Sequence, residues 1–153
     1  MEARELVAAL IRRGQTVATA ESLTAGLVCA TLTEVPGSSA TVRGGLIVYA
    51  TDLKRTLAGV DGALLAEHGA VHPEVAAQLA RGARERCGAD WGVGLTGVAG
   101  PDPQDGVAPG TVHLAVAGEG VLDARTLRMS GDRDAVRRAS VTAALGLLGE
   151  QLG

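Results

Sequence analysis

Lys54 is the only lysine among the 14 Lys and Arg residues of this sequence. A buried lysine can lose its proton and act as a base, whereas arginine keeps its charge. Tyr49, the only tyrosine, comes five residues earlier, where a strand is expected to end. The two residues are therefore candidates for catalysis. A surface lysine retained by chance remains the alternative.

Ser22 lies in the segment TAESLTAG, residues 19–26, where we expect a strand to end and a helix to begin. Free N–H groups at the start of a helix favour negative charge. Ser22 could therefore be a nucleophile whose oxyanion is held by backbone N–H groups, with Thr24, Ala25 and Gly26 beside it. An ordinary helix cap is the alternative, and this segment alone favours the cap.

A third candidate segment is the strand end that contains Thr96, Gly97 and Gly100. Its small residues would let the backbone approach a ligand closely, and ligands of α/β sheets bind at the carboxyl ends of strands. The Gly- and Pro-rich loop at 97–109 follows, and long loops inside compact domains are often functional. An ordinary strand exit explains the spacing equally well.

Several well-known catalytic patterns do not occur. The sequence has no GxxxxGK[ST] phosphate loop, no GxSxG turn around Ser22 and no lysine three residues after it. The interval of five between Tyr49 and Lys54 differs from the interval of four in short-chain dehydrogenases. His68, His72 and His113 lack the HExxH spacing, so we expect surface or capping roles for them and no metal site.

The periodicity of apolar residues and the turn signals predict alternating helices and strands. Helices are expected at 3–13, 21–35, 51–57, 61–68, 73–87 and 132–152. Strands are expected at 15–20, 44–50, 91–96, 110–117 and 121–129. This order predicts one α/β domain over residues 1–153, a three-layer α/β/α sandwich with a mixed, mostly parallel sheet and at least one antiparallel strand.

Composition excludes several classes of protein. The net charge of −3 is unlike that of a nucleic-acid-binding domain, and no apolar run is long enough to span a membrane. Arg133, Arg137 and Arg138 alternate with acidic residues, which indicates a solvated helix face. Cys29 and Cys87 have no metal or disulfide spacing, and we expect reduced thiols. The first residues are unlike a signal peptide, so the expected location is cytoplasmic.

Taken together, the segments AESLTAG, VPGSSATVRGGLIVYATDLK, HGAVHPEVAAQLARGARERCGAD and LTGVAGPD resemble the C-terminal domain of the CinA proteins. This domain also occurs alone as the PncC nicotinamide-nucleotide amidase. The resemblance covers about residues 5–150 and does not include the N-terminal molybdopterin-binding-like domain of CinA proteins. It implies hydrolysis of nicotinamide mononucleotide to nicotinate mononucleotide and ammonia, with this small molecule as the partner and no metal or organic cofactor.

The resemblance also implies roles for individual residues. Ser22 would attack the carboxamide, and neutral Lys54 would take its proton directly or through Tyr49, which requires a lowered lysine pKa. The substrate-binding residues would be Thr24, Ala25, Gly26, Thr96, Gly97 and Gly100, with the amide at Ser22 and the phosphate at the loop Gly97–Gly100. This sequence departs from the family pattern at Ala25, Ala50, Thr51 and His72.

Two other functions stay open from the sequence. CinA relatives are linked with competence and DNA damage, so the domain could be a non-catalytic interaction module. It could also hydrolyse a different small amide. Ser22, Tyr49 and Lys54 are all present, which favours an enzyme, because a degenerate site would have lost one of them. We further expect the chain to form a homo-oligomer.

Overall fold

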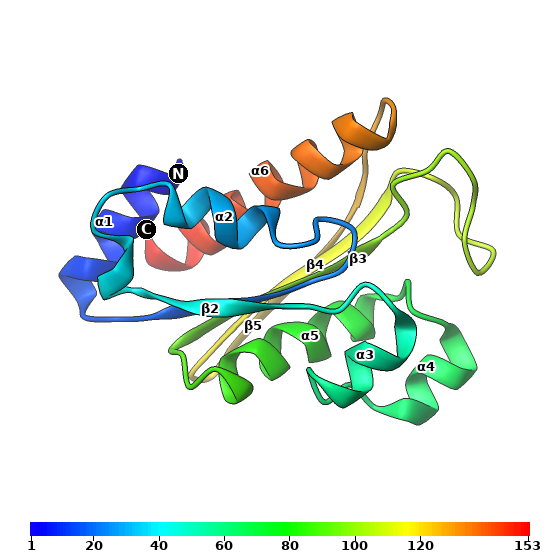
Figure 1. Ribbon diagram of the computed structural model, residues 1–153, viewed down its shortest axis with the longest axis horizontal. Helices are drawn as coiled ribbons and strands as arrows, with labels where there is room; N and C mark the ends of the chain where they lie inside the picture. Colours follow the sequence, from blue (N-terminus) through cyan, green and yellow to red (C-terminus); the bar gives the residue numbers. More distant parts are fainter.

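The computed structural model describes residues 1–153 as a five-stranded sheet between two layers of helices (Figure 1). The strands are β1 (Val17–Glu21), β2 (Val42–Ile47), β3 (Trp91–Gly97), β4 (Thr111–Gly118) and β5 (Val121–Arg128). The helices are α1 (Ala3–Arg13), α2 (Leu27–Thr33), α3 (Thr51–Thr56), α4 (Gly62–His68), α5 (Pro73–Arg86) and α6 (Arg133–Leu152), with a 3-10 turn at Ser38–Ala40. None of these helices combines the length and the apolar composition that a membrane span requires.

The sheet has the strand order β2-β1-β3-β4-β5 and is mixed, as predicted. β1 pairs in parallel with β2 and with β3, whereas β3–β4 and β4–β5 are antiparallel. Four strands therefore run in one direction and only β4 opposes them. Parallel pairing therefore accounts for two of the four strand pairs. The short turn that joins β4 to β5 imposes the antiparallel pairing of these two strands.

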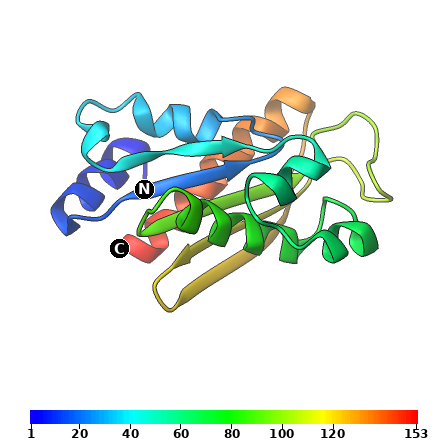
Figure 2. The ribbon, with the colours of Figure 1, turned by 60° about the horizontal axis from the view of Figure 1, so that its bottom comes forward.

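Helices cover both faces of the sheet, which confirms the predicted three layers. α1, α2 and α6 lie on one face, and α3, α4 and α5 lie on the other (Figures 1 and 2). The larger core, on the first face, is built from aliphatic residues such as Leu6, Leu10, Val28, Leu114 and Leu148. Both chain ends lie on this side, and the loop after β3 extends beyond the sheet at the opposite end (Figure 1).

Two glycines in β3 let helix α5 pack directly on the sheet. A Cβ at Gly92 would lie 2.0 Å from the carbonyl oxygen of Ala80, and one at Gly94 would lie 2.4 Å from the Ala80 nitrogen. These distances leave no room for a side chain. The glycines of β3 therefore set the spacing between the sheet and α5.

The helix after β1 begins later than predicted. Residues 22–26 form a turn, and α2 starts only at Leu27. Ala25 has a φ of 47° and Gly26 a φ of 96°, so the backbone here is left-handed and cannot continue a right-handed helix. Ser22 therefore lies on a turn after β1 and not in the first turn of a helix.

Candidate active site

Three segments that are distant in the sequence meet at one end of the sheet. Ser22 directly follows β1, Tyr49 lies just beyond β2, and Gly97 ends β3. The three strands are parallel neighbours, so their carboxyl ends lie along the same edge. This is the edge at which α/β sheets bind ligands.

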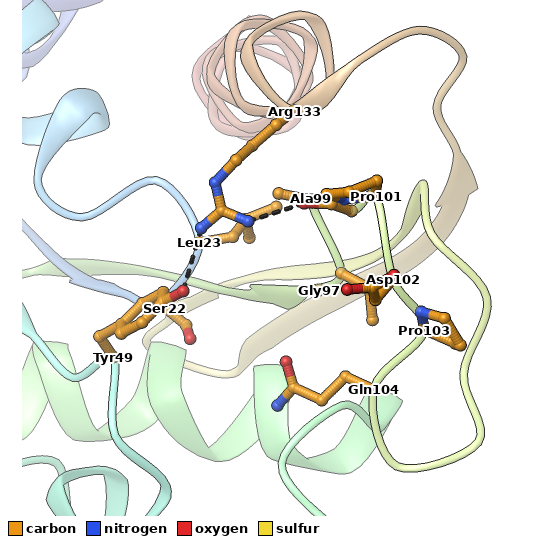
Figure 3. Close-up of a pocket in the computed structure, with 12 residues that line it drawn as sticks. Ser22, Leu23, Tyr49, Gly97, Ala99, Pro101, Asp102, Pro103, Gln104 and Arg133 are labelled. Atoms are coloured by element: carbon orange, nitrogen blue, oxygen red, sulfur yellow. Dashed lines mark hydrogen bonds between the residues drawn. The ribbon is translucent and has the colours of Figure 1, made fainter.

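A cavity of about 350 Å³ opens at this edge (Figure 3). Its wall is formed by the turn after β1, the end of β2, the loop after β3 and the start of α6. The lining residues are Ser22, Leu23, Tyr49, Gly97, Val98, Ala99, Gly100, Pro101, Asp102, Pro103, Gln104 and Arg133. Of the residues predicted from the sequence, Ser22, Tyr49, Gly97 and Gly100 therefore face a common space.

Lys54 lies behind Ser22 and reaches it from α3. Its side chain is 1% exposed, and its Nζ lies 3.0 Å from Ser22 Oγ. Nζ also donates to the carbonyl oxygens of Val48, at 2.7 Å, and Tyr49, at 3.1 Å. Lys54 forms no ion pair in the structure. Burial without a counter-ion lowers the pKa of Lys54 from 10.5 to about 8.

The three contacts of Lys54 can be made by the ammonium, which has three donors, and they also fit a neutral amine. Such an amine has two N–H donors and one lone pair. The carbonyls of Val48 and Tyr49 can take the two donors, which leaves the lone pair free to accept the hydroxyl proton of Ser22. The geometry thus permits transfer of one proton between Ser22 and Lys54.

The hydroxyl of Tyr49 is hydrogen-bonded to Arg133 and to neither member of this pair. Tyr49 is 60% exposed, and its hydroxyl accepts a hydrogen bond from Arg133 Nη2 at 3.0 Å (Figure 3). Only its backbone carbonyl contacts Lys54. The structure therefore has a direct contact between Ser22 and Lys54 and no hydrogen bond from the tyrosine hydroxyl to either residue.

Four of the predicted substrate-binding residues do not line the cavity. The hydroxyl of Thr24 donates to the carboxylate of Glu21, and Thr96 donates to the carbonyl of Ala70 at 2.8 Å. Ala25 and Gly26 form the left-handed part of the turn. The first N–H groups of α2 are not free for a substrate either, because those of Val28 and Cys29 donate to the carboxylate of Glu21.

Gly97 and Gly100 line the cavity for different physical reasons. A Cβ at Gly97 would lie 2.8 Å from the Thr111 carbonyl oxygen and 3.0 Å from Val112 Cα, so this glycine allows β3 to pair closely with β4. Gly100 has a φ of 90°, which a glycine adopts without strain and which turns the loop over the cavity. Leu23 adds a backbone N–H that donates no hydrogen bond within the chain.

Arginines of α6 were missed as site residues. Arg133 donates from Nη1 to the Gly100 carbonyl at 2.8 Å and from Nη2 to Tyr49, and Arg137 donates to the Leu23 carbonyl at 2.8 Å. The predicted solvated helix face holds for Arg133 and Arg138, which are exposed, whereas Arg137 is half-buried. Arg133 and Arg137 are four residues apart, which places them on one face of a helix. This spacing was the available sequence signal that both could face the site.

The cavity thus combines a buried serine–lysine pair with one cation at its wall. No group of three or more His, Cys, Asp or Glu side chains could hold a metal ion. Asp102 and Gln104 add a carboxylate and an amide on the loop after β3. Such a site suits nucleophilic attack by a serine on an electrophilic carbon of a polar, partly anionic molecule.

Sequence comparison connects the chain with known proteins. The family model of the CinA C-terminal domain matches residues 2–152. A CinA-like protein of Frankia casuarinae is 46% identical over 143 residues, which cover 94% of this chain and 33% of that protein. One of Anaeromyxobacter dehalogenans is 50% identical over 144 residues, or 94% of this chain and 35% of that protein. The chain spans about a third of the length of these curated relatives.

Solved structures share the fold. The competence/damage inducible protein CihA from Agrobacterium tumefaciens has a TM-score of 0.93 and 37% identity, covering 97% of this chain and 92% of that one. A competence-damaged protein (CinA) superfamily protein from Escherichia coli has a TM-score of 0.94 and 29% identity, covering 97% and 87%. On the match of its sequence and fold, the chain belongs to the CinA C-terminal domain family.

Proposed function

We propose that the chain is an amidohydrolase that converts nicotinamide mononucleotide to nicotinate mononucleotide and ammonia. The observation that carries this proposal is the 3.0 Å contact between Ser22 Oγ and the buried Nζ of Lys54. A serine beside a lysine whose pKa is lowered to about 8 is an activated nucleophile near neutral pH. The cavity in front of Ser22 gives a carboxamide access to it.

In the proposed mechanism, Ser22 Oγ attacks the carboxamide carbon while Lys54 Nζ takes the hydroxyl proton. The C–N bond then breaks, and the ammonium of Lys54 returns that proton to the departing ammonia. A water molecule next attacks the acyl-enzyme ester and gives its proton to Lys54. The carboxylate product leaves, and Ser22 regains its proton, so that the enzyme is unchanged.

Two features of the cavity support charge stabilisation in this reaction. The N–H of Leu23 follows the nucleophile directly and has no partner in the chain, so it can donate to the developing oxyanion. Arg133 uses two of its five N–H donors for Gly100 and Tyr49, which leaves others for the substrate phosphate beside the loop Gly97–Gly100. Guanidinium groups bind phosphates through paired hydrogen bonds.

The decisive experiment is an ammonia-release assay with nicotinamide mononucleotide, nicotinamide riboside, nicotinamide and glutamine. We expect turnover of the mononucleotide, weak turnover of the riboside and none of glutamine. Ser22→Ala should lower the rate by at least about 10³-fold, with an unchanged melting temperature as the control for folding. Turnover of glutamine in place of the mononucleotide would change the substrate assignment. No ammonia from any of the four amides would favour a non-catalytic interaction module.

A further inference from the structure

Glu21 is a buried carboxylate whose function the proposed reaction does not use. It is the last residue of β1, directly before Ser22, and its side chain is fully buried. It forms no ion pair in the structure. Carboxylates are rarely buried completely unless a cation or several hydrogen bonds compensate for the lost hydration. A buried, unpaired carboxylate next to a nucleophile therefore requires an explanation.

Four hydrogen bonds hold this carboxylate. Its Oε1 accepts from Thr24 Oγ1 at 2.8 Å and from the backbone N–H of Val28 at 2.9 Å. Its Oε2 accepts from Thr19 Oγ1 at 2.9 Å and from the backbone N–H of Cys29 at 3.1 Å. The donors come from β1, from the turn and from the first residues of α2. One side chain therefore ties together the elements on both sides of Ser22.

These contacts replace the missing cap of α2. The helix begins after Gly26, and no side chain of the turn caps it. Glu21 instead reaches past the turn and accepts from the second and third N–H groups of the helix, where a negative charge is favourable. The carboxylate of Glu21 thus joins the two ends of the turn 22–26, which contains the left-handed residues Ala25 and Gly26. We call its four hydrogen bonds the Glu21 clasp.

Glu21 does not act on the reacting atoms themselves. It does not line the cavity, and it is not a hydrogen-bond partner of Lys54. The lowered pKa of Lys54 results from burial and not from a neighbouring charge. Any effect of Glu21 on the reaction must therefore pass through the shape of the turn that carries Ser22.

We propose that Glu21 is a positioning residue, whose carboxylate fixes the turn 22–26 and so keeps Ser22 Oγ within hydrogen-bond reach of Lys54 Nζ. This inference rests on the proposed role of Ser22 as nucleophile, but not on the identity of the amide. Because the contact between Ser22 and Lys54 is needed in the reaction and the cavity wall is otherwise intact, loss of the clasp should lower kcat and leave KM nearly unchanged.

The test is Glu21→Gln, which keeps the size of the side chain but replaces one acceptor oxygen by an NH2 group, which donates and cannot accept from an N–H. We expect kcat to fall about 10–100-fold, with KM within about twofold of the wild-type value. Glu34→Gln is the matched control, because Glu34 lies exposed at the other end of α2. It should behave as wild type.

A second measurement separates positioning from a merely structural role and from the choice of substrate. A fluorophosphonate probe reacts with an activated serine whatever the natural amide is, so its labelling rate at Ser22 should fall with kcat, at a temperature well below unfolding. The apparent pKa in the pH profile of labelling should stay that of wild type. If no amide is hydrolysed but the probe labels Glu21→Gln more slowly than wild type, the substrate assignment is rejected and the role of Glu21 is retained.

Labelling of Glu21→Gln at the wild-type rate would overturn the proposal, as would a lower melting temperature with unchanged kcat. If Glu21→Gln does not fold, Thr24→Val removes only one of the four hydrogen bonds, and Thr24→Ser restores the hydroxyl. Slower labelling of Thr24→Val with recovery in Thr24→Ser would support the clasp. Equal labelling of both variants and wild type would refute it.

Discussion

Lys54 Nζ lies 3.0 Å from Ser22 Oγ, and the only other hydrogen-bond partners of this nitrogen are two backbone carbonyls. In a serine–histidine–aspartate triad a carboxylate orients the base and stabilises its charged form. Here no carboxylate does so, and burial makes the ammonium less favourable. In the proposed reaction Lys54 is the base. Desolvation lowers its pKa, and the carbonyls of Val48 and Tyr49 orient its amine, so its protonation is the property to test.

The first prediction concerns the pH dependence of turnover. Because Lys54 must be neutral to accept the proton of Ser22 and its pKa is about 8, kcat/KM should rise about tenfold per pH unit below pH 8 and level off above it. The measurement is a pH–rate profile between pH 6.5 and 10. A profile that stays flat through this range would mean that Lys54 is not the titrating base. Lys54→Arg should be inactive throughout, because arginine does not lose its proton.

The second prediction concerns stability. The pKa of Lys54 is lowered on folding, so the unfolded chain binds more protons between pH 8 and 10.5. The burial penalty is thus fully present below pH 8 and is relieved as pH rises to 10.5. Lys54→Met lacks this group. Its free energy of unfolding relative to wild type should therefore fall by on the order of 3 kcal/mol across this window. Chemical denaturation of both proteins at pH 7.5 and 10.5 measures the change, and a constant difference would contradict it.

Most of the fold could be predicted from the sequence, because its elements have strong local signals. Gly14 ends α1, His72 and Pro73 begin α5, and Gly118–Gly120 lies at the turn between β4 and β5, as the turn chemistry indicates. The start of α2 could not be predicted in this way. Ser22 and Thr24 look like helix caps, but the cap comes from Glu21, whose side chain reaches across the turn through tertiary contacts.

The site was predictable only in part, for a similar reason. The contact between Ser22 and Lys54 depends on the parallel pairing of β1 with β2, which the order of elements suggests. Arg133 is far away in the sequence and lies among acidic residues, so its charge looks solvated. Only the packing of α6 beside the loop after β3 brings its guanidinium to Gly100 and Tyr49. The spacing of Arg133 and Arg137 places both on one face of a helix, but it does not identify the segment that this face meets.

The third prediction concerns the phosphate. Arg133→Ala removes the cation that lines the cavity, so KM for nicotinamide mononucleotide should rise about 10–100-fold, the loss expected for a charge-assisted hydrogen bond. The same change should alter kcat/KM for the riboside, which has no phosphate, by less than about threefold. Arg138→Ala is the control, since Arg138 is exposed on the same helix. Equal losses for the two substrates would show that Arg133 only holds the loop and Tyr49.

The last prediction concerns the glycines that set the distance between the sheet and α5. A Cβ at Gly94 would lie 2.4 Å from the Ala80 nitrogen and 2.5 Å from the Ala76 carbonyl oxygen, both in the backbone, so Gly94→Ala must push the helix away. We expect a loss of about 2–4 kcal/mol of unfolding free energy, typical of an overpacked core. Gly146→Ala is the matched control, because Gly146 lies within α6 and nothing approaches a Cβ there. It should stabilise the fold by about 0.5–1 kcal/mol. Urea denaturation of the two variants tests the pair, and a Gly94→Ala protein as stable as wild type would show that α5 can shift without cost.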